Sequence, residues 1–392
     1  MKIDKKSRDI NILQIIKQKE AVELKKRLLV LGESYMNIQM QTNSPKTDED
    51  VTYGSSYGFH PYGAGAATAI AAAKLGGECI FCTKLGNDQY GERMRSYYKS
   101  CGLHLYPNKF ADNAQTGLSV TIYQDNENGH TYITKGANLT FTKQEIDEAF
   151  DFEPNMFIIP QEDVLSQIKE SEMETVSVSD VPQPTVAENT DDIDENIPED
   201  FSETIMFSSD EITAELDAAR NEPKNLVVYA AKKAVELGVD IVAEYTKYTS
   251  KLPLGELDGI KILVISDTML EEISGIKPAG IEKTLQALIP LAAKVKSKYY
   301  IVQQGNDSSF IYDGKYFEVI TLPAMLKAKA KQESTSMHGT YIGALASRFL
   351  ETRDIIDSCK YAGVASILTR SKFGCLDHIP SQDEIKEFTS EK

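Results

Sequence analysis

Short apolar runs alternate along this chain with segments of helical periodicity, and this alternation restricts the possible folds more than any other feature. The apolar runs are RLLVLGE, ECIFCTKLG, the run starting at Phe157, VDIVAEY, KILVIS and KYYIVQQG. Helical patterns lie between or after them, for example at 64–75, 224–237, 281–295 and 354–370. Strands that alternate with helices at this spacing predict an α/β protein whose central sheet is mainly parallel and covered by helices on both faces.

Two further segments interrupt this rhythm near the N-terminus. TGLSVTIYQ and GHTYITKG each alternate polar and apolar residues, and they flank the polar sequence DNEN. Such a pattern is typical of a β-hairpin. We therefore expect residues 36–59 and 115–135 to form a small sheet of their own, which covers a cleft floored by Gly63, Gly65 and Asn138.

The net charge of −17 is concentrated in one region. Residues 169–222 contain 17 acidic residues and only two basic ones, so the rest of the chain is close to neutral. This region is also rich in Ser, Thr and Pro and poor in aromatic residues, which predicts a disordered acidic insert at 165–223. A neutral remainder gives no basic face and therefore no support for nucleic-acid binding.

The N-terminal residues and the cysteines indicate no special targeting or chemistry. Residues 1–26 are expected to be a helical extension that packs on the domain or frays, with a partner-binding helix as the alternative. No apolar run has the length of a membrane helix and no signal-peptide pattern is present, so a cytoplasmic protein is expected. Cys79 and Cys82 form a C-x-x-C within a strand, where residues three apart point to opposite faces, so structural packing is favoured over metal or redox chemistry.

Six segments, in order, resemble hallmarks of one enzyme family. They are PYGAGAATAIAAAKLG, LGNDQYGERM, NGHTYITKGANLTFT, SDTMLEEISGI, ESTSMHGTYIGALASRFL and KYAGVASILTRSKFGCLDHIPSQDEI. Together they are similar to the ribokinase-like (PfkB) carbohydrate kinases over residues 27–164 and 224–392. The resemblance implies a ribokinase-like α/β domain with a small β lid formed by 36–59 and 115–135. It also implies ATP-dependent phosphoryl transfer to a sugar hydroxyl with Mg²⁺, and a homodimer that pairs through the lid.

The catalytic base of this family is missing from the aligned position. The family signature reads D-T-T-G-A-G-D, and its last aspartate aligns with Gly339, which has no proton acceptor. Because a positioned general base contributes about 10²–10⁴-fold to the rate, ordinary turnover should suffer by a similar factor. The neighbouring His338 is the candidate for a substitute base.

The nucleotide side also departs from the family pattern. The resemblance places nucleotide contacts at Gly305, Ser336, Met337, His338 and Gly339. The family has small residues before the helix so that its backbone can approach the transferred phosphate. The resemblance implies ATP, but Met337 and His338 are bulky and disfavour a tight phosphate cradle.

The metal positions of the family are altered as well. Its Asn and Glu positions fall on Ser266 and Met269, and a thioether is a poor ligand for a hard cation. Asp267 is the nearby alternative oxygen ligand. The sequence therefore assigns no residue to Mg²⁺.

On the sugar side, some family positions are retained and others are lost. The family aspartate that grips sugar hydroxyls is replaced by Asn37, and a sugar-contacting asparagine by Ala67. Gly63, Gly65 and Asn138 persist, so Asn37 and these three residues are the candidate substrate-binding set.

These departures predict a family member that is catalytically impaired and acts as a ligand-binding or regulatory pseudokinase. The alternative is an active sugar or nucleoside kinase that uses an unusual base such as His338. Its ligand would be a small sugar or nucleoside in either case.

Overall fold

A computed structural model of the chain describes residues 26–42, 53–124, 130–160, 226–246, 257, 259–304, 308–322, 335–370 and 376–390. The predicted disordered insert at 165–223, almost all of the N-terminal extension at 1–26, and Gly305 lie outside these residues. Within the described part of the chain, no helix has both the length and the apolar composition needed to cross a membrane.

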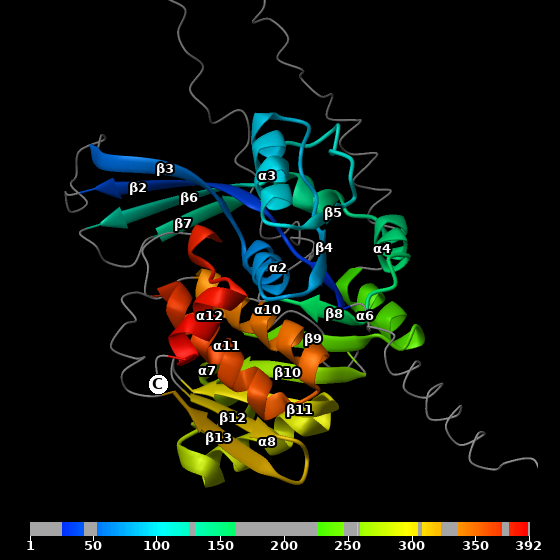
Figure 1. Ribbon diagram of the computed structural model, residues 1–392, viewed down its shortest axis with the longest axis vertical. Helices are drawn as coiled ribbons and strands as arrows, with labels where there is room; N and C mark the ends of the chain where they lie inside the picture. Colours follow the sequence, from blue (N-terminus) through cyan, green and yellow to red (C-terminus); the bar gives the residue numbers. More distant parts are fainter. Residues whose placement is uncertain are drawn as a thin grey trace, which may run out of the picture.

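A large twisted sheet forms the centre of the molecule (Figure 1). In the described residues it has nine strands in the order β13-β12-β11-β10-β9-β8-β1-β4-β5. Their bounds are β1 (Arg27–Leu31), β4 (Glu78–Cys82), β5 (His104–Tyr106), β8 (Met156–Ile159), β9 (Asp240–Tyr245), β10 (Ile260–Ser266), β11 (Ser297–Gln304), β12 (Ser308–Tyr312) and β13 (Phe317–Thr321). All neighbouring strands from β11 to β5 are parallel, and β12 and β13 add an antiparallel edge.

Helices cover both faces of this sheet, which confirms the predicted class. One core lies under α2 (Ala64–Lys74), α3 (Gln89–Ser100), α10 (Thr335–Thr352), α11 (Ile355–Arg370) and α12 (Gln382–Ser390). The other lies under α4 (Lys143–Phe150), α6 (Leu226–Glu236), α7 (Asp267–Ser274) and α8 (Gly280–Lys294). Alternate strand residues enter opposite cores because side chains alternate along a strand: Leu28 belongs to the first and Leu29 to the second.

The two cysteines of the C-x-x-C follow the same rule. Cys79 packs in the first core and Cys82 in the second, and both are buried free thiols. Burial raises the pKa of each thiol far above its ordinary value, so neither forms a reactive thiolate. The structural interpretation of this motif is confirmed.

A second, smaller sheet stands apart from the large one (Figure 1). Its described strands are β2 (Tyr35–Thr42), β3 (Gly54–Tyr62), β6 (Leu118–Gln124) and β7 (His130–Thr134), in the order β3-β2-β6-β7. The predicted hairpin is present, since β6 and β7 pair antiparallel, whereas β2 and β6 pair parallel. We call these four strands the small sheet.

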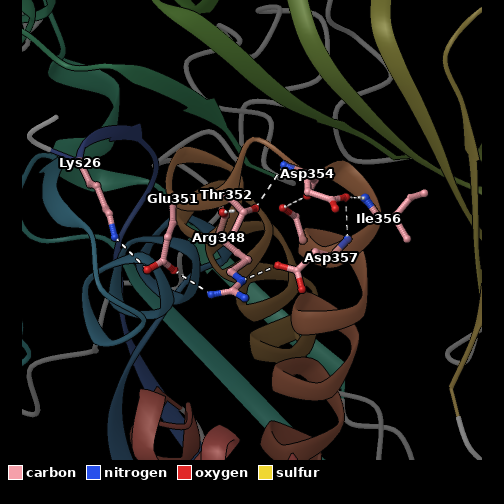
Figure 2. A network of polar contacts seen from close by, with 8 residues as sticks. Lys26, Arg348, Glu351, Thr352, Asp354, Ile356 and Asp357 are labelled. Atoms are coloured by element: carbon pink, nitrogen blue, oxygen red, sulfur yellow. Dashed lines mark hydrogen bonds and ion pairs between the residues drawn. The ribbon is translucent and has the colours of Figure 1, made fainter. Parts of the chain in front are cut away.

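The far end of α10 is tied to the sheet and to α11 by a polar network (Figure 2). Lys26 Nζ lies 3.2 Å from Glu351, and Arg348 lies 2.9 Å from Glu351 and 2.6 Å from Asp357. Partial burial opposes ionisation of Glu351, but hydrogen bonds from Lys26 and Arg348 outweigh it and lower the pKa of this carboxyl group. The backbone N–H of Asp357 also donates to Asp354, which stabilises the start of α11. The network holds α10 in place at the end opposite to Gly339.

Candidate functional site

The candidate residues come from three places in the fold. Asn37 and Asn138 lie with the small sheet and its connection to the large one, and Gly63 and Gly65 lie at the start of α2. Residues 336–339 belong to the first turn of α10. The start of α2 and the first turn of α10 meet at one helix crossing, since a Cβ atom on Gly339 would contact Ala64 and Ala67.

At this crossing α10 packs directly on the backbone of α2. A Cβ atom built on Gly339 would lie 2.6 Å from Cβ of Ala67 and 2.9 Å from the carbonyl oxygen of Ala64. One turn later, a Cβ on Gly343 would lie 2.8 Å from Cβ of Ala71. Contacts this short do not occur between real atoms, so only glycine fits at these two positions. The small residues that the sequence places on both helices allow this close approach.

His338 lies beside Gly339 and faces a buried carboxylate. Its Nδ1 atom is 3.7 Å from Oε1 of Glu244, whose side chain is 1% exposed, whereas the His338 side chain is 35% exposed. Glu244 comes from β9, close to the strand's carboxyl end. A buried carboxylate needs a compensating partner, and the imidazole provides positive charge when it is protonated.

A small pocket opens between the edge strands of the large sheet and the helices α10 and α11. His338 and Met337 line it, whereas Ser336 and Gly339 do not. Its other polar walls are Gln303, Ser308, Ser309 and Ser366. The pocket volume is about 30 Å³, which holds one or two water molecules.

Two further groups on the pocket wall are neutral. Burial raises the pKa of Tyr341 well above its ordinary value, and it raises the pKa of Cys359 to about 12. The Tyr341 hydroxyl shares a 2.9 Å hydrogen bond with the hydroxyl of Ser309. This wall is therefore polar and uncharged around neutral pH.

The residues at the family's metal position do not suit Mg²⁺. At the metal position, the hydroxyl of Ser266 accepts a 3.2 Å hydrogen bond from the N–H of Met269 and caps α7, while the thioether of Met269 is buried. Among the described residues, no group of three or more His, Cys, Asp or Glu could hold a metal ion. These residues do not form an oxygen-rich site for Mg²⁺.

On the sugar side, Asn37 is fully buried in a polar cluster of the small sheet. Its Oδ1 atom accepts hydrogen bonds from Ser119 at 2.9 Å and from Thr121 at 3.1 Å. Its Nδ2 atom is buried and has no hydrogen-bond partner among the described residues. A buried N–H donor without an acceptor costs about 1–3 kcal/mol, so this amide is suited to receive an acceptor atom.

Asn138 has different surroundings, because its side chain forms hydrogen bonds with backbone groups. It accepts a 3.0 Å hydrogen bond from the N–H of Ser34 and donates to the carbonyl oxygens of Ser34 at 2.9 Å and Lys135 at 2.8 Å. These bonds hold the connection between β1 and β2. Asn138 therefore supports the small sheet through its backbone contacts.

An ion pair that the sequence did not predict lies at the same connection. Lys135 Nζ is 2.8 Å from Oε1 of Glu33, and both side chains are largely buried. The hydroxyl of Tyr35 also donates to Glu33. Because these residues are 102 positions apart in the chain, no local pattern links Lys135 to Glu33. Glu244 was also missed, although a carboxylate inside the apolar run VDIVAEY was a signal that could have revealed it.

Comparison with known proteins agrees with this architecture. The profile of the pfkB family carbohydrate kinases matches residues 25–180. A bifunctional ribokinase/ribose-5-phosphate isomerase A of Fructilactobacillus sanfranciscensis is 23% identical over 367 residues, which are 92% of this chain but only 55% of that longer protein. A ribokinase of Staphylococcus aureus is 23% identical over 331 residues, covering 83% of this chain and 86% of the relative.

Solved structures show the same fold. The structure of Arabidopsis thaliana ribokinase complexed with ribose and ATP superposes with a TM-score of 0.66 at 18% sequence identity, and covers 93% of this chain and 98% of that chain. A ribokinase of Thermotoga maritima also superposes with a TM-score of 0.66, at 16% identity. The expected ribokinase-like fold is confirmed.

Proposed function

We propose that this chain, a ribokinase-like relative of the pfkB carbohydrate kinases, is a ligand-binding or regulatory pseudokinase. The packing at Gly339 carries this proposal. The family places its catalytic carboxylate at the aligned position, whereas here the space beyond Gly339 is filled by Ala64 and Ala67 of α2. Gly339 has no basic side chain, and α2 occupies the space where one would lie. The family's phosphoryl transfer then has no group that accepts the proton of the sugar hydroxyl.

Two observations support retained ligand binding. The buried amide donor of Asn37 has no hydrogen-bond partner among the described residues, and a ligand oxygen would satisfy it. On the other side of the helix crossing, a polar pocket lies open beside His338. A small sugar or nucleoside is the ligand class that the family resemblance suggests, and neither ATP nor Mg²⁺ is required for its binding.

One observation favours a second candidate, an active sugar or nucleoside kinase with His338 as the base. Glu244 lies behind the imidazole, and a carboxylate that orients a histidine is a recurring arrangement in general-base catalysis. This candidate requires the sugar hydroxyl to reach the outer nitrogen of His338 instead of the position of Gly339.

Measurement of ATP consumption tests the two candidates against each other. The protein is incubated with Mg²⁺, ATP and a panel of sugars and nucleosides, and ADP release is compared with a mock-purified control. We expect no sugar-dependent turnover above the control, while isothermal titration with the same panel detects binding of at least one compound. Robust turnover that His338→Ala abolishes would reject the pseudokinase and establish His338 as the base.

We also propose that the chain forms a homodimer through the small sheet. Cross-strand neighbours place Ile38, Phe59, Val120 and Tyr132 on one face of this sheet, and Tyr132 is 60% exposed. Ile38, Phe59 and Val120 are partly buried, and an apolar sheet face with such an exposed aromatic residue suits a protein interface.

Replacement of Tyr132 by glutamate should therefore convert the dimer to a monomer in sedimentation equilibrium, because a charge would be buried in the apolar interface. Tyr316→Glu is the matched control, since this tyrosine is 64% exposed at the other end of the molecule, between β12 and β13. A wild-type protein that sediments as a monomer would contradict the proposal.

A further inference from the structure

Among the described residues, three exposed apolar side chains lie at the edge of the large sheet where its parallel strands begin. Phe152 follows α4 and is 43% exposed, and Val235 and Leu237 at the end of α6 are 44% and 56% exposed. α4 leads into β8 and α6 leads into β9, so both helices end where neighbouring strands begin (Figure 1). We call these three side chains the amino-edge patch.

The chain enters the sheet beside this patch. Arg27 begins β1, and its guanidinium group donates a 2.7 Å hydrogen bond to the carbonyl oxygen of Phe152. Only β8 separates β1 from β9, the strand that follows Leu237. Since adjacent strands lie about 4.8 Å apart, the start of β9 is about 10 Å from the start of β1. Residues 1–25 therefore join the domain next to exposed apolar side chains.

The sequence of residues 1–25 suits an apolar surface at this place. Its residues Ile12, Ile15, Ile16 and Val22 recur at helical spacing. In a helix that rises 1.5 Å per residue, these side chains would lie about 6–21 Å from Lys26 along the helix axis. This reach includes the lateral distance from β1 to β9.

The charges of the segment and of the edge are opposite. Residues 1–25 contain seven basic and four acidic residues, a net charge of +3. The ends of α4 and α6 carry Asp151, Glu153 and Glu236, which are all exposed. The carboxyl-terminal ends of both helices add partial negative charge, because the last carbonyl groups of a helix lack intrahelical partners. This edge therefore attracts a basic segment that buries apolar residues.

We propose that residues 1–25 dock on the amino-edge patch of the same chain as an amphipathic helix. The apolar side chains of the segment cover Val235, Leu237 and Phe152, and its lysines lie beside the acidic residues. The segment is the favoured occupant because it is covalently joined to this edge, which gives it a high effective concentration against any free partner. Lys26 and Glu351 lie at the end of α10 opposite to its first turn, so the docking is independent of the proposed ligand binding.

Carbodiimide cross-linking of the full-length protein tests the proposal directly. The reagent joins a lysine to a carboxylate in contact with it, and peptide mass spectrometry identifies the pair. We expect Lys17 or Lys19 to be joined to Glu153 or Glu236 in the monomer band of a denaturing gel. The same pairs in a dimer band alone would show that the segment docks on a second copy, and would overturn docking within one chain. Absence of these pairs from both bands would refute the docking.

Cleavage by trypsin measures how firmly the segment is held. Cleavage after Lys17 and Lys19 should be about tenfold faster in Val235→Ser/Leu237→Ser, because lost apolar contact raises the undocked population. Ile289→Ser is the matched control, since this side chain is 69% exposed on α8, which precedes β11 and not β8 or β9. It should be cleaved at the wild-type rate.

Equal cleavage rates in the wild type and the double variant would refute the docking. An equal acceleration in the Ile289→Ser control would also refute it, because the effect would then not depend on the amino-edge patch. The cross-linking experiment uses the unmodified sequence, so it decides the proposal even if the double variant does not fold.

Discussion

Replacing Gly339 with aspartate is expected to lower the free energy of unfolding by about 3 kcal/mol and to leave ATP turnover at background. The new Cβ atom would lie 2.6 Å from Cβ of Ala67 and 2.9 Å from the N atom of Thr68, so α2 and α10 must separate. The added carboxylate would then be buried at an apolar helix crossing, which adds to the cost. An aspartate at this position is therefore expected to damage the fold before it can supply a base.

Glycine-to-alanine substitutions distinguish the steric effect of a new Cβ atom from the effect of the added carboxylate. Gly339→Ala should still destabilise by about 1–3 kcal/mol, because the α2 backbone cannot give way. Gly363→Ala on α11 is the matched control: the three atoms nearest to a Cβ there all belong to the side chain of Leu322, which can move, so the higher helix propensity of alanine should offset the contact. Urea unfolding measures all three variants. A Gly339→Asp protein that is as stable as the wild type would contradict the close packing of α2 on α10. Sugar-dependent ATP turnover in this variant would contradict the proposed pseudokinase function.

Replacing Asp88 with alanine is expected to cost about 3 kcal/mol of unfolding free energy, because one carboxylate holds three groups. It accepts hydrogen bonds from the N–H of Gly91 at 2.8 Å, from the N–H of Thr116 at 2.7 Å and from the hydroxyl of Thr116 at 2.8 Å. The first bond caps α3, and the other two fix the segment that leads into β6 of the small sheet.

Hydrogen exchange distinguishes this role from a general loss of stability. We expect the amides of β6 to exchange faster in Asp88→Ala, with those of β10 in the centre of the large sheet less affected. Asp112→Ala is the control, since Asp112 is exposed and, within the described part of the chain, accepts one 3.3 Å hydrogen bond, from Asn87. Equal stability of the two variants would show that Asp88 does not anchor the small sheet.

Much of the fold follows from local pattern, because backbone geometry alone sets the periods of strands and helices. Runs such as RLLVLGE predict buried strands, and the alternation in TGLSVTIYQ predicts a strand with one polar and one apolar face. The same rule predicts that Cys79 and Cys82 point to opposite faces of the sheet, and they enter different cores. That Gly339 carries no proton acceptor is likewise a property of the sequence.

What surrounds these residues was decided by the tertiary structure. Gly339 is closed off because two helices far apart in the chain cross at a distance that only glycine and alanine allow, and no sequence period encodes that distance. His338 lies close to Glu244 of β9, and Lys135 forms an ion pair with Glu33, which follows β1. The side chain of Asn138 forms hydrogen bonds with the backbone of Ser34. Each of these contacts depends on the packing of separate elements, so the sequence determined which groups were present and the fold determined which of them meet.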